Sequence, residues 1–200
     1  FIDLRVLGGN IPLLATYIRQ CLAYTTSYAF FYGYSQWLQE GRGLNASQAG
    51  LLLVPLSATA IGVTVLTGRR GRIRGRLVAG ALLQCLGCAA LLLLHDGSPL
   101  WLLVVLSAVV GLPHGLIGLA NQNALYAQAD PARMGSSAGL LRTFMYVGAL
   151  FAAAANAVFF RDGATSSGLH AMAWPLIGVA AVFLVLCTVR TSRDDVDGLS

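Results

Sequence analysis

The chain has 200 residues, of which 56% are hydrophobic and only 10% are charged, and its mean hydropathy is +0.70. A soluble domain usually carries about 25% charged residues, so this composition excludes most soluble fold classes and predicts an integral membrane protein. All 13 basic residues are arginine, and the formal net charge is +5. In a membrane chain, basic residues set orientation and contact anionic lipid. We therefore expect the lipid bilayer as a partner and no nucleic acid.

Long apolar runs recur along the chain, separated by short polar breaks or breaks rich in glycine and proline. A spanning helix needs about 20 mainly apolar residues. The sequence therefore predicts an all-α integral membrane protein with about six transmembrane helices in one domain, residues 1–190, and a cytoplasmic tail at 191–200. The predicted spans lie at about 12–38, 47–67, 76–94, 99–126, 133–160 and 170–190.

Positive charge is concentrated in the break between the second and third spans. This predicted basic loop contains Arg69, Arg70, Arg72, Arg74 and Arg76. Cytoplasmic loops near helix ends are enriched in arginine, so we predict that this loop is cytoplasmic. Alternation then places nine loop arginines inside and only Arg42 and Arg161 outside, with both termini of the segment in the cytoplasm. The arginine, alanine and glycine bias indicates a high-GC bacterial genome, which predicts the inner membrane as the location.

The cysteines do not predict a metal or redox site. All four lie within apolar runs, where cysteine is a small packing residue. Cys85 and Cys88 form a C-x-x-C pair on one predicted helix, without a second pair or a nearby histidine. We expect no metal and no cofactor.

Three stretches occur in a recognisable order. They are the loop and helix start from Leu44 to Leu56, with Pro55 in an apolar run, the glycine- and arginine-rich loop from Gly68 to Arg76, and the stretch from Asp130 to Thr143. Together they resemble the C-terminal six helices of the major facilitator superfamily, specifically its fourteen-helix drug:proton antiporter branch. The resemblance implies the C-terminal half of a major facilitator fold and proton-coupled efflux of small amphipathic compounds by alternating access. It also implies a missing N-terminal half as a partner, in agreement with a chain that starts at Phe1 without a signal peptide.

The first predicted helix carries a polar aromatic stripe. Tyr17, Gln20, Tyr24 and Tyr28 recur at steps of three and four residues and therefore share one face. Such a stripe suits a cavity for amphipathic compounds, through ring stacking and adaptable hydrogen bonds. The alternative is ordinary packing combined with an interfacial aromatic belt, to which we also assign Trp37, Trp101 and Trp174.

Two further residues are candidates for the substrate pathway. Arg142 is predicted to lie two to three turns inside the fifth span, where a charge costs roughly 2.5–3.5 kcal/mol. It either pairs with an acid of the missing half or snorkels to the surface, which is also the simpler interpretation of Arg19. His114 either titrates in the pathway or is a packed histidine.

The fourth predicted span is interrupted by small residues and a proline. Gly111 and Gly115 have the G-x-x-x-G spacing that lets another helix approach closely, and Pro113 removes a backbone hydrogen bond between them. This segment is predicted to be either a conformational hinge or a site of static close packing.

The six predicted spans contain no Asp or Glu, although a proton-coupled antiporter needs a membrane-buried carboxylate. The resemblance places such acids mainly in the missing half. Gly135 to Gly139 matches the G-x-S-x-G motif of hydrolases, but that motif needs a strand before a sharp turn, and here it opens a helix. We therefore expect no enzyme activity, with intramembrane hydrolysis as a remote alternative. A non-transporting membrane assembly protein, or a half-size partner subunit, is the other alternative.

Overall fold

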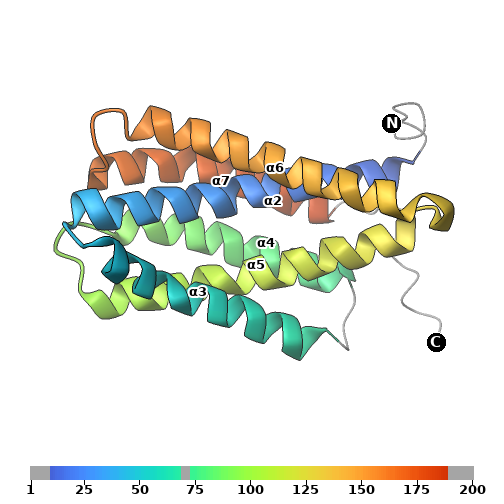
Figure 1. The fold of residues 1–200 in the computed structure, drawn as a ribbon, viewed down its shortest axis with the longest axis horizontal. Helices are drawn as coiled ribbons and strands as arrows, with labels where there is room; N and C mark the ends of the chain where they lie inside the picture. Colours follow the sequence, from blue (N-terminus) through green and yellow to red (C-terminus); the bar gives the residue numbers. More distant parts are fainter. Residues whose placement is uncertain (1–9, 69–72, 189–200) are drawn as a thin grey trace.

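A computed structural model describes residues 10–68 and 73–188 of the chain. Every regular element in these residues is helical, which confirms the predicted all-α fold. The six long helices lie side by side along the long axis of the molecule (Figure 1). They are α2 (Ile11–Gln36), α3 (Ala46–Thr67), α4 (Ile73–Ala90), α5 (Leu100–Gln128), α6 (Met134–Phe159) and α7 (Ser166–Thr188). Short helical turns extend three of them: the π-helical η1 (Trp37–Gly41), and the 3₁₀ turns η2 (Leu91–Leu93) and η3 (Pro131–Arg133).

Five of these helices are long and apolar enough to cross a membrane: α3, α4 with η2, α5, η3 with α6, and α7. α2 is not among them, although its 26 residues would rise about 39 Å at about 1.5 Å per residue. Polar residues of α2, among them Arg19, Gln20 and Thr26, lower its mean hydropathy. These three side chains are buried in the bundle. The assignment of α2 as a sixth span therefore stays a prediction.

The six helices form two consecutive triplets, α2 to α4 and α5 to α7, and the middle helix of each triplet packs against the first helix of the other. α3 packs chiefly against α5 and makes few contacts with its neighbour α2, while α6 packs chiefly against α2 and makes few contacts with α5. The last helices of the triplets, α4 and α7, pack against each other. This arrangement is the one expected for two three-helix repeats nested in one six-helix bundle.

Glycines permit both of these contacts between the triplets. A Cβ atom on Gly148 of α6 would lie 2.5 Å from the backbone oxygen of Cys21 on α2. A Cβ atom on Gly111 of α5 would lie 2.2 Å from the backbone oxygen of Leu56 on α3, and one on Gly115 would lie 2.4 Å from that of Ala60. The G-x-x-x-G pair is therefore a close-packing surface, as expected of small residues in membrane helices. A hinge at Pro113 stays a prediction, because α5 is continuous through it.

Part of the predicted basic loop belongs to a helix. Arg74 and Arg76 lie in the first turn of α4, whose start at Ile73 precedes the predicted start of the third span. Arg74 donates a 2.8 Å hydrogen bond to the backbone oxygen of Thr188 at the end of α7, and Arg76 donates one to that of Thr67 at the end of α3. Both guanidinium groups therefore satisfy the carbonyls of helix C-termini and favourably oppose the helix dipole. Arg69, Arg70, Arg72 and the tail at 191–200 lie outside the described residues.

The opposite end of the bundle is closed by hydrogen bonds between three connections. Trp37 donates its indole N–H to Ser166 over 3.1 Å, and Ser166 donates to Asp96 over 2.5 Å. Glu40 accepts from the backbone N–H of Ala164 over 3.1 Å. Trp37 is fully buried, whereas Trp101 and Trp174 are about two-thirds exposed. The assignment of Trp37 to an aromatic belt was therefore wrong, because the π-helical turn directs this ring into the bundle.

Candidate functional site

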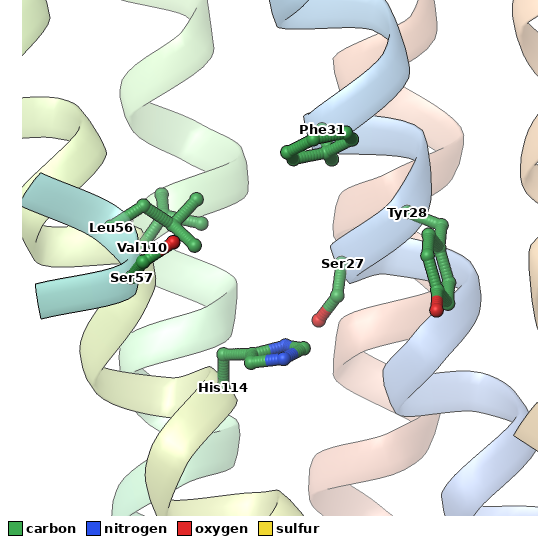
Figure 2. Close-up of a pocket in the computed structure, with 7 residues that line it drawn as sticks. All are labelled: Ser27, Tyr28, Phe31, Leu56, Ser57, Val110 and His114. Carbon is green, nitrogen blue, oxygen red and sulfur yellow. The ribbon is translucent and has the colours of Figure 1, made fainter. Parts of the chain in front are cut away.

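A groove runs between α2 on one side and α3 and α5 on the other. Two cavities lie along it, one of about 230 Å³ and one of about 330 Å³. We call them the upper cavity and the lower cavity. The upper cavity is lined by Ser27, Tyr28, Phe31, Leu56, Ser57, Val110 and His114 (Figure 2). The lower cavity is lined by Tyr24, Ala60, Ile61, Thr64, Val65, His114, Gly115, Gly118 and Leu119.

Aromatic rings follow one another along α2 at the groove, where Tyr24, Tyr28 and Phe31 line the cavities and Tyr32 lies next to them. The ring centroids of Tyr24 and Tyr28 are 5.8 Å apart, those of Tyr28 and Tyr32 are 5.6 Å apart, and those of Phe31 and Tyr32 are 6.0 Å apart. The series forms because α2 repeats an aromatic residue once per turn on this face. Flat rings with polar hydroxyls suit amphipathic ligands, since they stack on apolar surfaces and also form hydrogen bonds.

His114 lies where the two cavities meet. It is the one residue, in the described part of the chain, that lines both of them. Its imidazole projects from α5 towards α2, with the Ser27 hydroxyl pointing towards it (Figure 2). The imidazole also meets the ring of Tyr24 edge to face, with centroids 5.4 Å apart and an interplanar angle of 64°. His114 therefore lies between the upper and the lower cavity, with Tyr24 beside it on the side of the lower cavity.

Buried polar pairs fix α2 against α5 below the lower cavity. Asn121 donates a 2.9 Å hydrogen bond to Gln20, and Thr16 donates a 2.7 Å hydrogen bond to Gln128. The earlier residue of α2, Thr16, pairs with the later residue of α5, Gln128, so the two helices are antiparallel. Arg19 is 1% exposed and donates to Thr16 over 2.8 Å, which places this guanidinium in the bundle interior rather than at its surface.

Not all of the predicted pathway residues lie at the groove. Tyr24, Tyr28 and His114 line its cavities, and Gln20 lies below them. Tyr17 instead packs between α2 and α6, where it stacks on Phe144 at 5.4 Å and donates to the backbone oxygen of Ser137 over 3.2 Å. Arg142 is exposed on α6 and lines neither cavity.

Two buried amides that hold α2 in place were not identified from the sequence. Gln84 of α4 donates to the backbone oxygen of Ala23 over 2.9 Å and also contacts Thr26 and the groove residue Ser27. Asn156 of α6 donates to the backbone oxygen of Ala29 over 3.4 Å. Each is the one Asn or Gln in its helix, and an isolated amide in a spanning helix is the sequence signal that identifies such a contact.

The groove is neutral and mostly apolar. No carboxylate and no arginine line either cavity in the described residues, where Glu40, Asp96, Asp130 and Asp162 all lie beyond the ends of the apolar helices. Within residues 10–68 and 73–188, no group of three or more His, Cys, Asp or Glu residues is arranged to hold a metal ion. The G-x-S-x-G segment lies inside α6, and its Ser137 is packed under Tyr17.

The sequence of the chain matches one family model and is similar to one transporter-type relative. Residues 2–153 match the family model described as the Major Facilitator Superfamily. The chain is also 25% identical, over 193 residues, to an uncharacterized MFS-type transporter, YwoD, of Bacillus subtilis (strain 168). That alignment covers 95% of the present chain and 42% of the relative, so the chain spans less than half the length of this relative.

Proposed function

The chain belongs to the Major Facilitator Superfamily, and we propose that its groove is one wall of a transport pathway for small amphipathic compounds. The observation that carries the proposal is the pair of cavities that meet at His114 beside a row of tyrosines. Ligand sites are typically apolar clefts of about 300–1,000 Å³ with a few placed polar groups. The upper cavity, about 230 Å³, is smaller than this range, and the lower cavity, about 330 Å³, is at its lower end. Both sizes fit half of a site that a second domain completes.

The second half of the pathway is a six-helix partner that covers the groove. The length of the relative supports this partner, because the alignment covers only 42% of that protein and leaves room in it for a second set of helices. The exposed faces beside the groove support it too, since α3 presents Leu51, Val54 and Ile61, and α6 presents Tyr146 and Leu150. Rocking of one six-helix unit against the other would then give alternating access around a site near the middle of the bilayer.

The direction and energy source that we propose are proton-coupled efflux, as in the drug:proton antiporter branch. The proposed setting is the bacterial inner membrane, with Arg74 and Arg76 at the cytoplasmic end of the bundle and Arg42 and Arg161 at the outer end. Arginine enrichment on the cytoplasmic side supports this orientation.

Substituted-cysteine labelling tests the groove. In the protein expressed from its native gene, Ser57→Cys places a thiol in the upper cavity, and Ser167→Cys places one at the exposed start of α7. We expect a transported dye such as ethidium to slow maleimide labelling at position 57 but not at position 167, relative to the parent protein with its four free cysteines. Equal labelling with and without dye, together with no dye efflux from cells, would overturn the proposal in favour of a non-transporting assembly protein.

A further inference from the structure

We propose that His114 is the proton-exchange residue of the groove, which takes up a proton when the groove is empty and loses it when an organic cation binds. This inference rests on the transport function proposed above. It assigns a proton-coupling role to a residue of this chain, whose six predicted spans contain no Asp or Glu.

The position of His114 fits this role. A coupling group must exchange protons with water on each side of the membrane in turn, and it must sense the substrate. His114 lines both the upper and the lower cavity. It also follows Pro113, which cannot donate the backbone hydrogen bond to Val109, so α5 lacks one stabilising bond beside this side chain.

The other groups facing His114 do not titrate near neutral pH. α2 presents the phenols of Tyr24 and Tyr28, and the cavity residues from α3 and from α5 itself include no other titratable group. A phenol has an ordinary pKa of about 10 and an imidazole one of about 6.5. Among the cavity residues, the imidazole is therefore the group suited to gain and lose a proton between about pH 5 and 8.

The polar groups around His114 are uncharged. The ring centroids of His114 and Tyr24 are 5.4 Å apart, with an interplanar angle of 64°. The Ser27 hydroxyl points towards the imidazole (Figure 2). No carboxylate and no arginine line either cavity in the described residues, so the imidazole gains or loses its proton without leaving a partner charge uncompensated.

Proton and substrate then exclude each other. An organic cation stacked on Tyr24 and Tyr28 lies beside the imidazole, and two positive charges repel strongly in a poorly hydrated groove. Binding of the cation therefore releases the proton from a ring nitrogen to water in the open cavity. On the other side of the membrane, a proton from water returns to that nitrogen and displaces the cation, so each cycle exchanges one proton for one cation.

Two measurements on the natively expressed protein in lipid nanodiscs test the inference. The first is a ¹⁵N-histidine NMR titration from pH 5 to 8. The His114 signal is identified as the one that remains when His95→Gln and His170→Gln are combined, since the chain has three histidines. The second is the affinity for tetraphenylphosphonium at pH 7.5 and 5.5. We expect His114 to change its protonation state in this range, and the wild-type Kd to rise several-fold at pH 5.5, as expected for competition between the cation and a proton.

The variants decide between the outcomes. In His114→Gln the Kd is expected to change less than twofold between the two pH values, whereas His170→Gln, which removes a hydrogen bond to the backbone oxygen of Leu94 far from the cavities, keeps the wild-type dependence. A wild-type His114 that stays in one protonation state from pH 5 to 8 would overturn the inference even if His114→Gln fails to fold. A folded His114→Gln protein whose Kd for tetraphenylphosphonium depends on pH as in the wild type would also overturn the inference. Absence of binding by the wild type at every pH would instead reject the transport function, and the inference with it.

Discussion

The side-chain amide of Asn121 on α5 donates a 2.9 Å hydrogen bond to Gln20 on α2, across 101 positions of sequence. Both side chains are buried, and the pair lies between the lower cavity and the Thr16–Gln128 hydrogen bond. It fixes the register of the two helices that carry Tyr24 and His114. Gln20 and Thr16 lower the hydropathy of α2, and the same two residues hold α2 in register with α5 along the groove.

Loss of this hydrogen bond should destabilise the bundle by a measurable amount. We expect Gln20→Leu or Asn121→Leu each to lower the free energy of unfolding by about 1 kcal/mol, within the range seen for hydrogen bonds between membrane helices. Each single variant leaves one buried amide without its partner, whereas the double variant removes both amides. The double variant should therefore cost less than the sum of the two single variants. Steric-trap unfolding in bicelles measures all four proteins. Strict additivity would show that the two amides do not interact.

Close packing of α3 on α5 should be sensitive to a single methyl group. Gly111→Ala places a Cβ atom 2.2 Å from the backbone oxygen of Leu56, which neither helix can accommodate without moving. We expect a cost of about 1–3 kcal/mol, as for other overpacked sites, and a thermal midpoint lower by several degrees. The matched control is Gly178→Ala on α7, where an added Cβ meets no atom within 4 Å. Equal midpoints for the two variants would contradict the close contact.

The fold was predictable because a lipid solvent imposes long apolar runs that need no knowledge of tertiary contacts. Helix ends were less predictable. Arg74 and Arg76 look like loop residues in the sequence but lie in the first turn of α4, where their guanidinium N–H groups donate to the carbonyls of Thr188 and Thr67. These acceptors lie at the ends of other helices, so the sequence around the two arginines does not predict the contacts.

The groove was only partly predictable for a related reason. Tyr17, Tyr24 and Tyr28 lie on one stripe of α2, yet α6 covers Tyr17 through Phe144 while the other two face the cavities. Periodicity identifies the stripe but not the neighbour that covers each part of it. The same limit applies to Trp37, which resembles a belt residue in sequence and is buried in the structure.

Removal of a groove tyrosine should change which compounds are exported. Tyr28→Ala deletes a ring that contacts both Tyr24 and Tyr32, so we expect resistance to fall several-fold for flat aromatic compounds and little for aliphatic ones. Tyr17→Phe is the control, because it loses only the 3.2 Å hydrogen bond to Ser137 outside the cavities. Resistance profiles against a compound panel, at equal expression, measure the effect. A uniform loss across the panel in Tyr28→Ala would indicate damaged packing instead.

Arg142 provides the clearest test of a contact with the proposed second half. Its side chain is exposed on α6, one turn before the exposed Tyr146, and no ion pair forms there within the described residues. A guanidinium at this depth is costly unless it is paired or reaches the surface. We predict that it pairs with an acid of the covering half, so Arg142→Ala should reduce efflux at least several-fold while membrane insertion and protein level stay unchanged.

Arg161→Ala is the matched control for this prediction. Arg161 lies just beyond the other end of α6, and its 3.3 Å ion pair with Asp162 joins two highly exposed side chains. Exposed pairs of this kind contribute little, so we expect wild-type efflux and wild-type stability. Dye efflux from everted vesicles, normalised to protein by immunoblot, compares the two variants directly. Wild-type efflux in Arg142→Ala would leave snorkelling to the lipid surface as the explanation of this residue and would remove it from the pathway.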